Sequence, residues 1–286
     1  MHYRSSIGAL ALTAALSATF AGAFAFDEAK YPDLKGQWSR MRFPGIAGQP
    51  SFDQTKSAGA GQQAPLTPEY QLIFEDNLKD QAAGGQGIDP TSTCLSPGMP
   101  RIMTAYEPME IIVTPETTHI LMEHIHDSRR IYTDGRGWPK EIEPSFAGYS
   151  IGQWRDEDGA GRYTMLEVET RGFKGPRTYD AAGIPLHKDN QTVIKERFYL
   201  VKGGKDLLED EITINDHALT RPWTVTKHYK REPSQRPVWR ESVCAENNSH
   251  VEIGGEHYYL SADGLLMPAK KDQRPPDLKF FNQTKK

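Results

Sequence analysis

From residue 109 onward, apolar and polar residues alternate in short runs that are separated by turn-forming clusters. This alternation is typical of strands with one face in a core and the other in solvent. Short connections such as Gly203-Gly204 and Gly254-Gly255 predict antiparallel hairpins. The predicted strands cover residues 109–113, 119–132, 149–154, 163–173, 192–201, 207–215, 224–229, 238–244 and 251–260. A further strand is predicted near Trp38. Helices do not alternate with the strands, which argues against a parallel α/β fold. We therefore expect a mainly β fold with a single antiparallel up-and-down β-barrel.

The region before these strands is rich in loops and contains one predicted helix. Residues 43–65 are dense in Gly, Pro, Ser and Gln, which predicts an extended or mobile connection. Thr67 suits a helix N-cap, Pro68 the first helical position, and Gly84-Gly85 the stop. The apolar stripe of this helix is Tyr70, Ile73, Phe74 and Leu78. We expect the helix to pack on the barrel or to close one of its ends.

The first 25 residues are predicted to be a signal peptide. Arg4 provides a short positive region, residues 7–24 are almost free of charge, and Ala23-Phe24-Ala25 has small residues where a signal peptidase reads them. An uncleaved anchor is the alternative, because the apolar run approaches the length of a membrane span. We expect cleavage after Ala25, a periplasmic or secreted protein and no stable membrane insertion. The mature chain, 26–286, is predicted to be one domain with an extension (26–110), a strand meander (111–262) and a C-terminal tail (263–286).

Composition narrows the class of protein further. The 286 residues include 34 Lys and Arg against 38 Asp and Glu, a net charge of -4, which argues against nucleic-acid binding. After export, Cys94 and Cys244 would lie in an oxidising compartment, where thiols tend to pair. We therefore expect a Cys94–Cys244 disulfide, with two unpaired buried thiols as the alternative. Their spacing fits neither a zinc knuckle nor a redox CxxC pair.

Several strings of residues resemble a large family of uncharacterised secreted bacterial proteins. They are residues 126–136, 148–154 and 166–173, followed by His187-Lys188-Asp189, Glu196-Arg197-Phe198, Arg221-Pro222-Trp223-Thr224 and residues 241–247. The resemblance covers roughly residues 95–250 and implies a lipocalin-like β-barrel. It brings no assigned activity and no catalytic residue. The sequence departs from the family pattern between Trp154 and Leu166, where it inserts residues 156–161.

Ionisable side chains are concentrated in the predicted strand 119–132 and the turn after it. They are Glu123, His124, His126, Asp127, Arg129, Arg130, Tyr132, Asp134 and Arg136. The inner face of a barrel with a ligand cavity can hold such groups, and burial would shift their pKa values towards acid–base use. The alternative is structural: Arg129 or Arg130 pairs with Glu167, Glu169 or Glu196 across strands, and Asp134-Gly135 makes a turn.

Two patterns bear on metal binding. His124 and His126 would point to the same face of a strand, as two of three ligands do in barrel metalloenzymes. A third ligand would come from another strand, with candidates His187, His217, His228, Glu167, Glu169 and Glu196. The Glu that a cupin pattern requires after the second His is missing, so we expect no metal there.

The second of these patterns is acidic and resembles a calcium loop. Asp156, Asp158, Gly161 and Glu167 match four EF-hand positions, but Ala160 occupies a ligand position and no helices flank the segment. A solvated acidic hairpin is therefore favoured over a calcium site.

Two further features have both a structural and a functional interpretation. Trp223 begins a predicted strand, where it either anchors the core or stacks on a flat ligand at a cavity mouth. His187 and Asp189 occupy a predicted loop between strands, as a general base over a barrel mouth or as an ordinary surface pair.

These patterns lead to one functional hypothesis and two alternatives. The barrel would bind a small, largely apolar or aromatic molecule and act on it as a lyase, dehydratase or isomerase without a cofactor. His126 would be the base, and Arg130 and Tyr132 would polarise a ligand oxygen. The other predicted ligand contacts are His124, Arg129, Glu167, Glu169, Glu196 and Trp223. The alternatives are a binding protein without turnover and a structural envelope protein; the sequence does not predict the oligomeric state.

Overall fold

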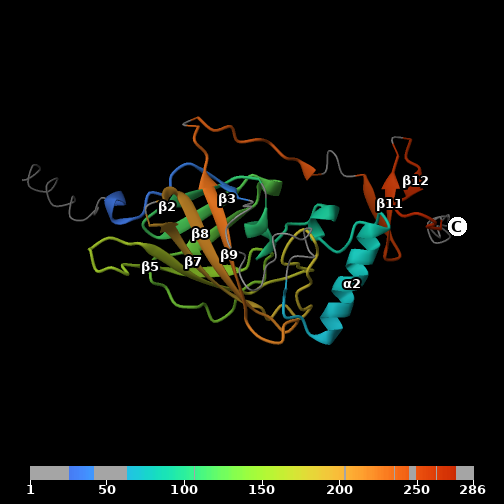
Figure 1. The fold of residues 1–286 in the computed structure, drawn as a ribbon, viewed down its shortest axis with the longest axis horizontal. Helices are drawn as coiled ribbons and strands as arrows, with labels where there is room; N and C mark the ends of the chain where they lie inside the picture. Colours follow the sequence, from blue (N-terminus) through green and yellow to red (C-terminus); the bar gives the residue numbers. More distant parts are fainter. Residues whose placement is uncertain are drawn as a thin grey trace, which may run out of the picture.

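The computed structural model describes residues 26–41, 63–105, 107–202, 204–234, 236–244, 249–261 and 263–274. Nine strands close into a β-barrel in sequence order, and a separate three-stranded sheet follows (Figure 1). The barrel strands are β1 (Gln37–Arg40), β2 (Met109–Val113), β3 (Thr117–Met122), β4 (Ser128–Tyr132), β5 (Tyr149–Arg155), β6 (Met165–Arg171), β7 (Val193–Val201), β8 (Gly204–Asn215) and β9 (Trp223–Arg231). The other elements are α2 (Pro68–Ala82), the 3-10 turns η1 (Glu28–Lys30), η2 (Pro90–Thr93), η3 (Arg101–Thr104) and η4 (His124–His126), and the sheet β10 (His250–Ile253), β11 (Glu256–Leu260) and β12 (Leu266–Pro268). A mainly β chain with a closed barrel is thus confirmed. The predicted signal peptide and most of the connection 43–65 lie outside the described residues.

The prediction of a purely antiparallel up-and-down barrel is wrong at one position. β4 and β5 pair in parallel, with Ile131 opposite Ser150 and Tyr132 opposite Ile151. Two parallel neighbours cannot be joined by a tight hairpin, so residues 133–148 carry the chain back to the other end of the barrel. All other neighbouring strands of the barrel are antiparallel.

The long predicted strand 119–132 is also divided. β3 ends at Met122 and β4 begins at Ser128, with η4 between them. Ile125 adopts a φ of 55°, and the Met122 N–H donates to the Asp127 carbonyl at 2.9 Å, which closes the turn. His124 and His126 therefore lie on a turn and do not share a strand face.

The predicted strand 251–260 is a hairpin outside the barrel. Gly254 and Gly255 form its turn with φ values of 63° and 83°, a conformation that glycine adopts without strain. This sheet lies beside α2 (Figure 1): Gln86 donates to the Tyr259 hydroxyl at 2.9 Å, and Lys270 pairs with Asp80 at 2.5 Å.

Loops and α2 cover one end of the barrel, here called the helix end. It is formed by η3 and residues 172–192 and 216–222. The capping signals for α2 are confirmed, since Thr67 accepts the Tyr70 N–H at 3.4 Å and Pro68 opens the helix. Tyr70 and Phe74 are buried, and the Asn77 amide donates to the Ala182 carbonyl at 2.7 Å, which ties α2 to the loop 172–192.

The predicted disulfide between Cys94 and Cys244 is confirmed, with a Cα–Cα distance of 5.6 Å. It joins the segment before β2 to the segment after β9, which are 150 residues apart. None of the helices in the described part of the chain has the length and hydropathy needed to span a lipid bilayer.

Candidate functional site

An ion pair crosses the inside of the barrel. Burial alternates along β4, so Arg129 and Ile131 point inward while Ser128 and Arg130 point to solvent. Arg129 donates to both carboxylate oxygens of Glu196 on β7, at 2.9 and 2.6 Å, and both side chains are 1% exposed or less. The hydroxyls of Ser150 and Thr170 lie 2.8 Å apart beside the guanidinium. Arg129 therefore pairs with a glutamate on another strand, as the structural interpretation of the sequence proposed.

A second buried pair, Asp210 and Lys227, lies in the same interior. These residues are directly opposite on β8 and β9. Asp210 is completely buried, and neither of its carboxylate oxygens has a hydrogen-bond partner among the described residues. Burial, reinforced by the nearby Glu196 carboxylate, raises the pKa of Asp210 well above its ordinary value. Burial and then the charge of Arg40 lower the pKa of Lys227 to about 8.

Aromatic rings cover this pair from the helix end. The Lys227 ammonium lies 4.9 Å from the centre of the Tyr179 ring, and Tyr179 packs against Trp223 with ring centres 4.4 Å apart. Trp223 is 1% exposed, which agrees with its interpretation as a core anchor. Its indole N–H and the Tyr179 hydroxyl also lack a hydrogen-bond partner within the described residues.

Most of the other predicted site residues lie outside the barrel. Arg130 is exposed, and the Tyr132 ring lies under the Arg136 guanidinium at 3.9 Å. Glu167 forms a surface ion pair with Arg155 at 2.6 Å, and Glu169 forms one with Arg171. The structure therefore separates the predicted polarising residues, Arg130 and Tyr132, from the inward-facing Arg129 and Glu196.

The turn η4 carries the two predicted histidines. His124 Nδ1 lies 3.2 Å from the Glu107 carboxylate, whereas the side chain of His126 lies outside what the structure describes. The acidic segment 156–161 binds its own backbone: Asp156 accepts the N–H groups of Ala160 and Gly161 at 3.2 and 2.9 Å. This is the arrangement expected of an acidic hairpin.

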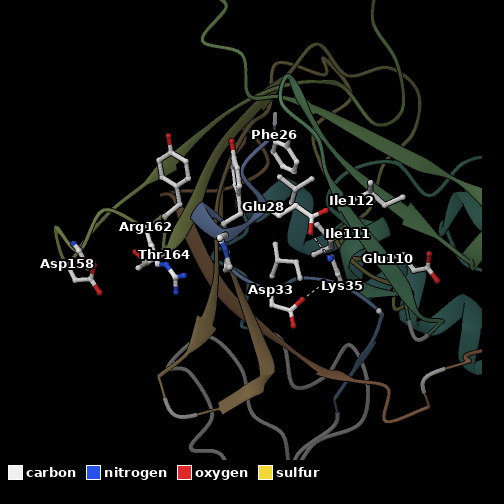
Figure 2. A pocket seen from close by; sticks show the side chains of 18 residues that line it. Phe26, Glu28, Asp33, Lys35, Glu110, Ile111, Ile112, Asp158, Arg162 and Thr164 are labelled. Atoms are coloured by element: carbon white, nitrogen blue, oxygen red, sulfur yellow. Dashed lines mark hydrogen bonds and ion pairs between the residues drawn. The ribbon is translucent and has the colours of Figure 1, made fainter. Parts of the chain in front are cut away.

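A pocket of about 840 Å³ opens at the end of the barrel opposite the helix end. Residues 26–36 run through this region between β2 and the β5–β6 loop, and Figure 2 shows Ile111 and Ile112 on one side and Arg162 and Thr164 on the other. We call this the N-terminal pocket. The sequence did not identify it, because residues 26–36 have no recognisable motif and are far from β2 and residues 158–164 in the chain.

Aromatic rings form the floor of the N-terminal pocket. The Tyr31 ring centre lies 5.0 Å from Phe26, 5.1 Å from Tyr163 and 5.2 Å from Trp154, and Trp154 points into the barrel. The Tyr163 N–H donates to the Lys30 carbonyl at 2.7 Å, which holds the segment against the β5–β6 loop. These aromatic contacts therefore connect the pocket lining to Trp154 of β5.

Charged groups lie around the apolar floor. Glu28 and Lys35 form an ion pair at 2.7 Å, and Asp33, Glu110, Asp158 and Arg162 also line the pocket (Figure 2). Arg231 donates to the carbonyls of Asp33 and Lys35 and lies over the Trp38 ring at 4.3 Å, so it fixes the segment to the barrel wall. The pocket thus combines an apolar floor with a polar rim.

No model of a known protein family matches the chain, and no curated protein sequence matches it either. The functional conclusion therefore depends on the geometry of the barrel and its sites.

Proposed function

We propose that the protein binds a small, largely apolar or aromatic molecule in the N-terminal pocket. The observation that carries this proposal is the pocket itself: about 840 Å³, with Phe26, Tyr31 and Tyr163 on its floor and ionised groups at its rim. Ligand pockets of proteins commonly have volumes of about 300–1,000 Å³ and apolar walls with a few polar groups. The rim charges of Glu28, Lys35 and Arg162 would orient a polar substituent of the ligand.

The proposal predicts that a charge on the pocket wall weakens binding of an apolar probe. Ile112 lines the pocket and is 44% exposed, so Ile112→Glu can be made without opening the core. We expect the variant to bind the fluorescent probe N-phenylnaphthylamine roughly tenfold more weakly than the wild type, as measured by fluorescence titration, because a carboxylate would have to be desolvated.

The matched control is Leu72→Glu on α2, where the leucine is 62% exposed and far from the pocket. It should leave the affinity for the probe unchanged. Equal affinities for the wild type and Ile112→Glu would show that the probe binds elsewhere.

The barrel interior supports a second candidate function, acid–base catalysis on a small molecule as a lyase, dehydratase or isomerase. The observation that favours it is the Asp210–Lys227 pair, whose pKa values are both displaced towards neutrality. Such displacement is common at catalytic sites. His126 remains a further proposed base, to be examined by His126→Ala.

Turnover can be measured on any small molecule that is retained on the purified protein and identified by mass spectrometry. We expect the wild type to convert this molecule, as followed by NMR, and Asp210→Asn to bind it without conversion. Equal conversion by both proteins would remove Asp210 from the mechanism, and no conversion by either would favour a pure binding protein.

We also infer that the protein is exported to the periplasm or secreted and that its barrel is lipocalin-like. The Cys94–Cys244 disulfide supports export, because thiols pair stably in oxidising compartments. The closed barrel supports the second inference, whereas the parallel β4–β5 pair departs from an up-and-down barrel.

A further inference from the structure

Two loops at the helix end bring two histidines and a carboxylate together. His187 and Asp189 belong to the β6–β7 loop, and His217 belongs to the β8–β9 loop. Asp189 lies between the two imidazoles: its carboxylate oxygens are 3.0 Å from His187 Nδ1 and 2.6 Å from His217 Nδ1. One ligand atom from each of the three side chains lies within 4.8 Å of the other two.

The backbone around this cluster is braced by Asp216. One oxygen of its carboxylate accepts the N–H groups of His187 and Ala218, both at 2.8 Å, and the other accepts the Thr192 hydroxyl at 2.5 Å. The Asp216 side chain thus joins the β6–β7 loop to the β8–β9 loop by hydrogen bonds. The cluster is therefore positioned by hydrogen bonds that do not involve its own side chains.

The His187 ring has an additional support from α2. Its centre lies 5.2 Å from the Tyr70 ring, and the Tyr70 hydroxyl accepts the N–H of Lys188 at 3.3 Å. The Asp189 N–H also lies 3.1 Å from His187 Nδ1, so this nitrogen is held next to Asp189. Imidazole side chains bind metal ions through a ring nitrogen that carries no proton.

The donor set matches a divalent transition-metal ion. Imidazole nitrogens and carboxylate oxygens are common zinc ligands, and catalytic zinc sites with three protein ligands keep a fourth position open. Bonds of about 2.0 Å in a tetrahedron hold the ligand atoms about 3.3 Å apart, which is within the 4.8 Å that spans the three donor atoms. The His217 side chain is 66% exposed, so an ion can enter from solvent.

We propose that His187, Asp189 and His217 form a binding site for a divalent transition-metal ion of the zinc type, which fastens the β6–β7 loop to the β8–β9 loop at the helix end. This site is separate from the N-terminal pocket and does not depend on the proposed ligand. It also differs from the His124 and His126 pattern considered in the sequence.

The test is calorimetric titration of the full chain, produced without a polyhistidine tag and treated with a chelator, with Zn²⁺ alone. We expect one equivalent of Zn²⁺ to bind to the wild type. Asp189→Asn and His217→Gln should each weaken binding at least about 100-fold, because loss of a direct ligand exceeds the 10–100-fold effects of outer-shell changes. With Co²⁺ in place of zinc, the visible absorption of a protein-bound ion should be present in the wild type and lost in both variants.

His119→Gln on β3 is the matched control, because His119 lies outside the cluster, and it should retain wild-type affinity. Circular dichroism of every variant shows whether it has folded. Absence of Zn²⁺ binding by the folded wild type would overturn the proposal and leave a hydrogen-bonded His–Asp–His clasp. Unchanged affinity in folded His217→Gln would overturn it as well, by placing the ion elsewhere.

Discussion

Individual polar residues of this barrel can be assigned to the inside or the outside by their register alone. Asp210 shares its strand face with Leu208 and Ile212, which are both completely buried. Every second residue of a strand points to the same side. A charged residue whose neighbours at i-2 and i+2 are buried apolar residues is therefore expected to be buried as well. The same rule places Arg129 inside and Arg130 outside, a choice that the sequence analysis left open.

The burial of Asp210 predicts a pH-dependent cost to stability. Its pKa in the unfolded chain is near 3.8 and is raised on folding by burial and by Glu196 on β7, while Arg129 on β4 and Lys227 on β9 act in the opposite direction. Between the two pKa values the native state retains a proton that the unfolded state has lost, so stability decreases as the pH rises, by about 1.4 kcal/mol per pH unit for this group. Asp210→Asn is free of this cost, and its stability relative to the wild type should increase from about pH 4 to about pH 7.

Urea unfolding of both proteins at the two pH values measures this difference. Asp206→Asn is the control, because Asp206 lies on the same strand with its side chain 55% exposed, paired with Arg231 at the surface. Its stability relative to the wild type should be similar at both pH values. The same relative stability of Asp210→Asn at both pH values would contradict the assigned shift.

At the scale of the element, the existence of strands was predictable and their partners were not. Alternation identifies a strand and its inner face, and Thr67 with Pro68 identifies the start of α2. Neither signal reports which strand lies next to which, and for this reason the parallel contact of β4 with β5 was missed. The break after Met122 was missed because Ile125 adopts a positive φ, which is unusual for a β-branched residue and has no sequence signature.

The Arg129–Glu196 ion pair joins two strands that are not neighbours, and it makes a prediction at this scale. Arg129→Met leaves the Glu196 carboxylate buried without its partner, so we expect a loss of about 3–5 kcal/mol in the free energy of unfolding. The double variant Arg129→Met/Glu196→Leu should recover most of this loss, because no uncompensated charge remains.

Chemical denaturation of the three proteins gives these differences. Arg155→Met removes one partner of an exposed pair with Glu167 and should cost less than about 1 kcal/mol. A double variant as unstable as Arg129→Met would indicate that packing, and not the charge, dominates at this position.

At the scale of the whole molecule, buried charged side chains lie inside the barrel and the described pocket lies at one of its ends. The Arg129–Glu196 ion pair and the opposed residues Asp210 and Lys227 are buried, loops cover the helix end, and the pocket lies at the opposite end. The pairing of two cysteines can be predicted from a sequence with an export signal, because thiols in oxidising compartments usually form disulfides. A sequence cannot predict a pocket assembled from residues 26–36, 110–113 and 158–164, since only the closed barrel brings these segments together.

The position of Phe26 would place the N-terminus of a processed chain at the N-terminal pocket. Its ring contacts Tyr31 on the pocket floor, and it is the residue that follows the predicted cleavage point at Ala25. Removal of the leader would leave a free α-ammonium group at Phe26, with a pKa of about 8, close to Glu28. In the precursor, an uncharged peptide bond joins Ala25 to Phe26 instead. We therefore expect a processed chain to carry one more positive charge at this pocket than the precursor does.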